Sequence, residues 1–187
     1  MANNPLLNTF NTPFNTVPFN EIKLEHFLPA VKKGIETGLQ NLKKIQDNTE
    51  EPTFENTILL LESNSEDLGK VLTVYFNLYN SEADEEFQKL AEEISPICSD
   101  FDNDIYLNEK IFLKVKSVFE NIDKLNLEDV RLTEKYYKSF VRSGALLSDK
   151  DKEKMRKIDR ELSVLSPRFS KNVLNATCLV QIYNIQI

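Results

Sequence analysis

The sequence contains a single histidine, His26, and this scarcity limits the metal chemistry that the chain can support. A catalytic zinc ion in a hydrolase is commonly held by two histidines and a carboxylate, and an HExxH helix supplies both imidazoles from one turn. No HExxH segment is present. We therefore expect no metal ligand in this chain, and we interpret His26 as a partly buried residue at the start of a helix.

Glycine is also scarce, and its placement argues against two further classes of enzyme. Phosphate-binding loops need clustered glycines, whereas the four glycines here stand apart from one another. No GxSxG motif is present, so the nucleophile turn of an α/β-hydrolase is absent as well. We expect no cofactor-binding residue, and the scattered glycines are Gly34, Gly38, Gly69 and Gly144.

The two cysteines, Cys98 and Cys178, have no metal-ligand spacing and are expected to be free thiols in a reducing compartment. Cys98 could act as a nucleophile only if the fold brought His26 beside it as a base. Asp100 and Asp102 follow Cys98 closely in the chain, and acidic neighbours raise the pKa of a thiol. We therefore predict an inert core thiol and no catalytic residue.

Basic residues do not dominate the chain, which has 23 Lys and Arg against 30 Asp and Glu and a net charge of -7. This balance argues against a nucleic-acid partner and against a basic helix on a membrane surface. No run of about 20 apolar residues suggests a membrane span, and no signal peptide is recognised. We expect a cytoplasmic protein. Acid pairs such as Glu92 and Glu93, and the mixed-charge run at residues 150–157, are interpreted as exposed helix surface.

Apolar residues recur at steps of three and four along most of the chain, which predicts helices. The segment 68–79 is apolar on almost every side and is expected to be surrounded by protein, with a buried strand as the alternative. Pro96 is expected to kink or split its helix, and Pro167 to kink the last helix. The fold class is therefore all-α, an irregular bundle of six or seven helices. The predicted helices cover residues 28–45, 52–63, 68–79, 84–106, 109–122, 127–147 and a last segment that starts at Ser148.

The two ends of the chain differ from this helical pattern. Residues 1–22 form an extended arm with three phenylalanines, and its prolines at Pro13 and Pro18 exclude a helix. Residues 178–187, CLVQIYNIQI, carry no charge, glycine or proline and are predicted to be a β-prone strand without a partner. Residues 23–177 make up the helical domain between them.

Several segments, taken together and in order, carry a family resemblance. They are NPLL at Asn4, TPF at Thr12, VPFNEIKLEHFLPA from Val17, PTFENTILLLE from Pro52, VYFNLYNSEAD from Val74, ISPICSDFDNDIYLNEKIF from Ile94, YYKSFVRSGALLS from Tyr136 and LSVLSPRFSKNVLNAT from Leu162. In this order they resemble the N-terminal part of the zinc metallopeptidases of family M3, the thimet oligopeptidase type. The likeness is strongest to the bacterial peptidyl-dipeptidase and oligopeptidase A branch.

The resemblance implies a helical ellipsoid divided by a deep channel that admits only short unstructured peptides. In this family the zinc is held by an HExxH helix and a later glutamate, and the N-terminal helices form one wall of the channel. All of these catalytic positions belong to the C-terminal half, so no site residue is carried over to this chain. Zinc and short peptides are therefore expected only in the whole enzyme. The departure from the family begins after Thr177, and a truncated gene, a shifted reading frame or a deliberate fragment would each produce it.

The arm resembles the family's leader, which is expected to lie across the helical body. Burying one phenylalanine contributes roughly 1.5–3 kcal/mol, so Phe10, Phe14 and Phe19 could fix the arm, in part to surface outside this chain. Two functional hypotheses follow. The first is an inactive channel-wall piece of an M3 peptidase. The alternative is a stand-alone helical interaction module that self-associates through exposed apolar surface. An independent enzyme without metal is a third reading, and it would need a site that the sequence does not reveal.

Overall fold

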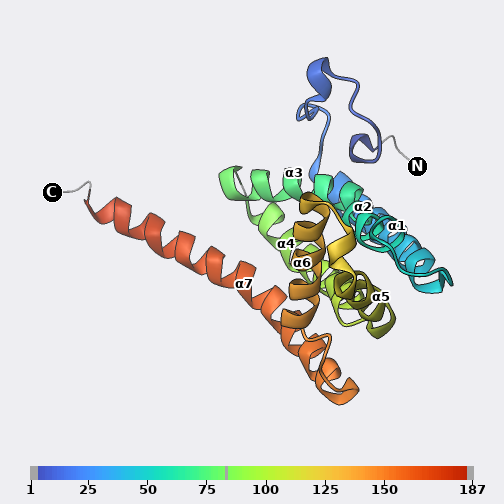
Figure 1. Cartoon of the computed structure of the whole chain (residues 1–187). Coiled ribbons are helices and arrows are strands. Elements are labelled where there is room, and N and C mark those ends of the chain that lie inside the picture. The colour runs from blue at the N-terminus through green and yellow to red at the C-terminus, as the bar shows by residue number, and fades with distance from the viewer. Residues whose placement is uncertain (1–3, 83, 185–187) are drawn as a thin grey trace.

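Helices account for most of the computed structural model, which describes residues 4–82 and 84–184 (Figure 1). No strand occurs in these two ranges. The predicted all-α bundle is therefore confirmed. The α-helices in chain order are α1 (Phe27–Asp47), α2 (Leu60–Ser63), α3 (Glu66–Glu82), α4 (Glu85–Tyr106), α5 (Glu109–Glu120), α6 (Leu127–Arg142) and α7 (Asp149–Asn184).

Short polar side chains set where several of these helices begin. Asp84 accepts hydrogen bonds from the backbone N–H groups at the start of α4, and Asn108 and Asn126 do the same for α5 and α6. Such caps satisfy donors that have no partner inside the helix. The helix starts predicted from periodicity therefore agree with the structure to within a few residues.

The predicted helix at residues 52–63 is present, but its first part has a wider winding. Thr53 caps it: its hydroxyl accepts from the Asn56 N–H at 3.2 Å, and the Asn56 side chain accepts from the Thr53 N–H at 2.8 Å. The segment Phe54–Leu59 is a π-helix, and α2 continues from it. Hydrophobic spacing does not distinguish this short wide turn from an α-helical one.

The core forms where α1 packs against α3 and α4. Its aromatic centre is made by Phe27 of α1, Tyr75 of α3 and Phe87 of α4, with ring centroids 5.2–6.0 Å apart. The Tyr75 hydroxyl donates to the Phe87 carbonyl at 2.6 Å, which satisfies the one polar group of this cluster. α5 and α6 pack on each other at one side of this core, and α7 packs along α4.

The prediction that residues 68–79 are surrounded by protein was wrong. They form part of α3, a helix and not a strand, and one face of it is buried through Val71, Val74 and Tyr75. The opposite face is exposed at Thr73 and Asn77. Polar residues at a helical spacing therefore mark a solvent-facing side even in a segment of high overall hydrophobicity.

The expected end of α6 also needs correction. The two helices that contain a proline, α4 and α7, each continue through it, so Pro96 does not split α4, and the kinks at Pro96 and Pro167 stay predictions. α6 ends at Arg142 and not at residue 147. Gly144 stops it, with φ at +100°, and the N–H groups of Gly144 and Ala145 bond back to the carbonyls of Val141 and Phe140. This is the Schellman arrangement, which glycine favours because of its positive φ.

The arm stands off the helical body (Figure 1), and its described residues, 4–22, contain no α-helix, as predicted. Short 3-10 turns at Pro5–Leu7 and Pro13–Asn15 interrupt its extended backbone. The expected aromatic anchors are not buried: Phe14 is 99% exposed and Phe19 52% exposed. Leu6 is the buried residue of the arm, and its neighbour Asn4 donates to the His26 carbonyl at 2.8 Å.

The predicted β-strand at the C-terminal end was wrong for the residues that can be checked. α7 continues as a helix to Asn184, and residues 185–187 lie outside the described range. Extending an existing helix adds one hydrogen bond for each residue fixed, whereas a strand needs a neighbour to pair with. Propagation of the preceding helix therefore outweighs the local β propensity of this segment.

Candidate functional site

A cavity of about 590 Å³ lies between α3, α4, the end of α6 and α7. Its lining includes one aromatic side chain from α3, a run of polar residues from α4 and an apolar side chain from α7. The residues on which the argument depends are Phe76, Cys98, Asp102, Asn103, Arg142 and Leu162. Elements far apart in the sequence thus combine to form this candidate site.

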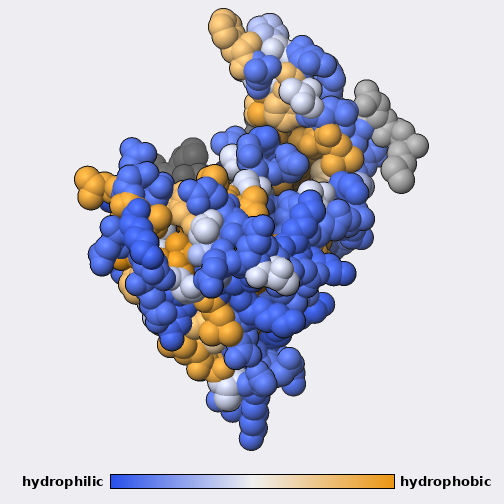
Figure 2. Space-filling model, turned by 45° about the vertical axis from the view of Figure 1, so that its right-hand side comes forward, coloured by the Kyte–Doolittle hydropathy of each residue, from blue (hydrophilic) through white to orange (hydrophobic). Residues whose placement is uncertain are grey.

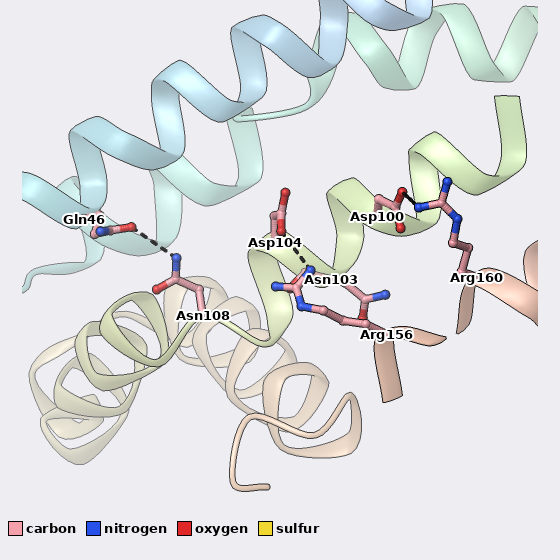
Figure 3. A network of polar contacts seen from close by, with 7 residues as sticks. All are labelled: Gln46, Asp100, Asn103, Asp104, Asn108, Arg156 and Arg160. Carbon is pink, nitrogen blue, oxygen red and sulfur yellow. Dashed lines mark hydrogen bonds and ion pairs between the residues drawn. The ribbon is translucent and has the colours of Figure 1, made fainter. Parts of the chain in front are cut away.

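Ion pairs between α4 and α7 hold one wall of the cavity in place. Arg156 contacts Asp104 at 2.9 Å, and Arg160 contacts Asp100 at 2.8 Å (Figure 3). A step of four residues forward along α7 is matched by a step of four residues back along α4, so the two helices run antiparallel. A third pair, Arg168 with Glu92 at 2.9 Å, continues the series. Arg156 also donates to the Asn103 carbonyl at 3.3 Å.

These pairs correct two predictions about exposed surface. Residues 150–157 were expected to be a solvent-facing run, but Lys152 is buried and Arg156 lies against α4. Glu92, expected to be solvated, pairs with Arg168. A usable signal was present in the sequence: basic residues four apart on one helix and acidic residues four apart on another. Without knowledge of which helices are neighbours, that signal cannot be assigned.

Burial dominates the electrostatics of the cavity. It raises the pKa of the Asp102 carboxyl above its usual range. Burial, and after it the charge of Asp102, raises the pKa of the Cys98 thiol to about 12. The thiol is therefore protonated at neutral pH and is a poor nucleophile. The predicted effect of an acidic neighbour is confirmed for Asp102, although burial is the larger cause.

His26 is not brought to the cavity. It lies partly buried at the start of α1, as interpreted from the sequence, and its Nδ1 accepts a hydrogen bond from the Lys23 N–H at 3.0 Å. Its side chain thus caps the turn that leads into α1. The structure therefore does not place this imidazole among the residues that line the cavity with Cys98.

The residues present do not fit a catalytic zinc ion. In the two described ranges, no group of three or more His, Cys, Asp or Glu side chains has a geometry suited to a metal. The one imidazole already uses a ring nitrogen to cap a helix. A zinc site of the histidine and carboxylate type therefore could not be assembled from these donors.

The cavity also has unused hydrogen-bonding capacity. The Nδ2 of Asn103 is buried and has no partner, and Asn103 is one of the lining residues. The lining therefore offers a hydrogen-bond donor, carboxylates and hydroxyl groups. Among the helices that the structure describes, none is both long and apolar enough to cross a bilayer.

Comparison with known proteins identifies relatives of this chain. No protein-family model matches the chain. The chain is 33% identical over 175 residues to dipeptidyl carboxypeptidase of Escherichia coli (strain K12), which covers 92% of this chain and 26% of that protein. Curated peptidases of family M3 thus align with more than nine tenths of this chain. The resemblance found in the sequence is confirmed.

Two other relatives match the chain in the same way. Oligopeptidase A of Escherichia coli (strain K12) is 26% identical over 93% of the chain and 25% of its own length. The organellar oligopeptidase A of Arabidopsis thaliana is 29% identical over 95% of the chain and 22% of its own length. This chain therefore spans about a quarter of the length of the curated relatives it matches.

Proposed function

We propose that this M3 chain is the helical wall segment of a zinc metallopeptidase that acts on short peptides, and that it does not cleave peptides alone. One observation carries the first part: 92% of the chain aligns with a dipeptidyl carboxypeptidase, yet the match occupies 26% of that enzyme. The donor set supports the second part, because the single imidazole is committed to a helix cap. In this proposal zinc and the peptide belong to the whole enzyme, where other segments would supply the ligands.

The proposal extends to partners and location. We propose no nucleic-acid partner, because the net charge of -7 opposes contact with phosphates. We also propose no membrane partner, because the net charge of -7 opposes binding to an anionic membrane surface. A cytoplasmic location is supported by the free thiol of Cys98, because unpaired cysteines suit a reducing compartment.

A zinc measurement combined with a cleavage assay tests this function. The purified chain is analysed for bound zinc and incubated with a short internally quenched peptide, with dipeptidyl carboxypeptidase of Escherichia coli as the positive control. We expect clearly substoichiometric zinc and no cleavage above a mock purification. Stoichiometric zinc, together with chelator-sensitive cleavage that co-elutes with the chain, would overturn the proposal.

A second function, self-association as a helical interaction module, is favoured by the surface of α7. Five of its apolar side chains are each about half exposed or more: Ile158, Leu162, Leu165, Phe169 and Val173. Figure 2 shows a mostly hydrophilic surface on which apolar side chains gather in patches over the arm and lower on the body. A contiguous apolar stripe of this kind attracts protein. Light scattering over a dilution series would detect the association, and a constant monomer mass would exclude it.

A further inference from the structure

The exposed stripe of α7 has the spacing of a coiled-coil seam. Met155, Ile158, Leu162, Leu165 and Phe169 follow one another at steps of three, four, three and four residues. These are the a and d positions of a heptad, the pattern that packs one helix against another. The side of α7 that carries Arg156 and Arg160 faces α4, whereas the residues of the seam from Ile158 onward are exposed.

α7 also extends beyond the helix that supports it. The antiparallel register sets Arg168 beside Glu92, so residues after about 175 lie beyond the start of α4 at Glu85. In Figure 1 this end of α7 leaves the rest of the bundle. A helix without tertiary contacts is only marginally stable in water. One long helix packed along α7 would cover both the seam and the projecting end.

We infer that the occupant is α7 of a second copy, packed antiparallel on the first. Packing Leu162 against the partner's Leu165 also sets Ile158 against the partner's Phe169, and the two-fold axis repeats both layers. In the same register residue 150 lies opposite residue 177. The partner's α7 begins at Asp149, which lies opposite residue 178, so the first turn of each helix covers the beginning of the other's projecting end. This inference rests on the self-association proposed above and not on the peptidase assignment.

Charges beside the seam favour this register. Glu161 and Arg168 occupy the g positions that flank the seam, and antiparallel pairing sets each opposite the other in the partner. Within the described part of the chain, Glu161 forms no ion pair. Arg168 uses Nε and Nη2 to bond Glu92, which leaves Nη1 free for the partner's Glu161. A parallel pairing would instead set Arg168 beside the partner's Val173.

Sedimentation velocity with the full chain tests the inference, from about 1 to 200 µM, a range that brackets weak self-association. We expect a monomer–dimer equilibrium. Leu165→Glu should weaken dimerisation at least about 30-fold, because the symmetric interface buries the new charge twice. Leu174→Glu is the matched control: Leu174 is 52% exposed against 55% for Leu165 and lies on the same helix outside the seam. Its dissociation constant should change less than about threefold.

A charge swap tests the antiparallel register itself. Glu161→Arg and Arg168→Glu should each weaken the homodimer about tenfold, because each sets like charges together. An equimolar mixture of the two variants should recover dimers, because both cross-pairs become opposite in charge. Far-UV circular dichroism confirms that each variant remains folded.

The outcomes separate this inference from the function it rests on. A monomer throughout the range overturns both and leaves the stripe to a different partner, such as a further segment of an M3 peptidase. A dimer that survives Leu165→Glu overturns only the seam. A wild-type dimer whose charge variants do not recover on mixing overturns only the antiparallel register.

Discussion

At the scale of single residues, two glycines of α1 decide how closely the neighbouring helices approach it. A Cβ added at Gly38 would overlap the ring of Phe101 on α4, and one at Gly34 would lie 3.0 Å from the Leu68 Cα on α3. Gly69 has open space around it. We expect Gly38→Ala to lower the free energy of unfolding by about 1–3 kcal/mol, because overpacking outweighs the gain in helix propensity. Gly69→Ala should raise it by about 0.5–1 kcal/mol, and urea denaturation measures both. If both variants were stabilised alike, the result would contradict the close packing inferred at Gly38.

A second residue-scale prediction concerns the buried carboxyl of Asp102. Burial raises its pKa, so the folded state holds this proton more tightly than the unfolded state does. The free energy of unfolding should therefore fall as pH rises from the ordinary carboxyl range through the raised pKa, and stay lowered above it. The substitution Asp102→Asn removes this pH-dependent fall in the free energy of unfolding. We expect the variant to be more stable than the wild type at pH 7 and no more stable near pH 3, by urea denaturation at each pH. Asp123→Asn, at an exposed position, is the control, and an equal gain there would contradict the assignment to burial.

At the scale of elements, ion pairs join α7 to α4. The Arg156 and Asp104 side chains are 34% and 46% exposed, so solvent screens their attraction. A double-mutant cycle with Arg156→Gln and Asp104→Asn should give a coupling of about 0.5–1 kcal/mol that shrinks in 1 M salt. The pair Lys138 and Glu134 within α6 serves as reference and should give about 0.3–0.5 kcal/mol. Zero coupling at low salt would show that the ion pair does not help to hold α7.

Element by element, the sequence predicted those features that depend on local spacing. α1, α4 and α5 follow from the spacing of apolar residues along one face of each helix. The apolar pattern continues past the end of α6. That end was predictable only by recognising Gly144 as the residue that follows a helix. The helical course of Cys178–Asn184 was not predictable from local β propensity, since the preceding helix decides it. The burial of Leu6 in place of the three phenylalanines depends on which surface lies nearby, and local sequence carries no such information.

At the scale of the whole molecule, the candidate site was the least predictable part. Its lining comes from α3, α4, the end of α6 and α7, and these meet only in the folded chain. The sequence did reveal the chemistry that is lacking, because one histidine and scattered glycines can be counted without a fold. It also revealed the M3 family, because eight short segments in order are a property of the chain and not of its packing. Predicting the ion pairs that hold α7 would have required knowing that α4 is its neighbour.

The last prediction concerns how stability is distributed along α7. Between Arg156 and Arg168 the helix packs on α4, whereas residues 173–177 lie where that support ends. Amide hydrogens exchange by local opening, so we expect residues 173–177 to exchange at least about tenfold faster than residues 156–168 in dilute solution. If α7 pairs with a second copy, raising the concentration from about 5 to 200 µM should slow exchange in 173–177. The buried face of α5, from Ile111 to Val118, should not respond. Exchange measured by mass spectrometry at both concentrations provides the check. Uniform protection along α7 at the lower concentration would mean that the body supports the whole helix and that its apolar stripe needs no partner.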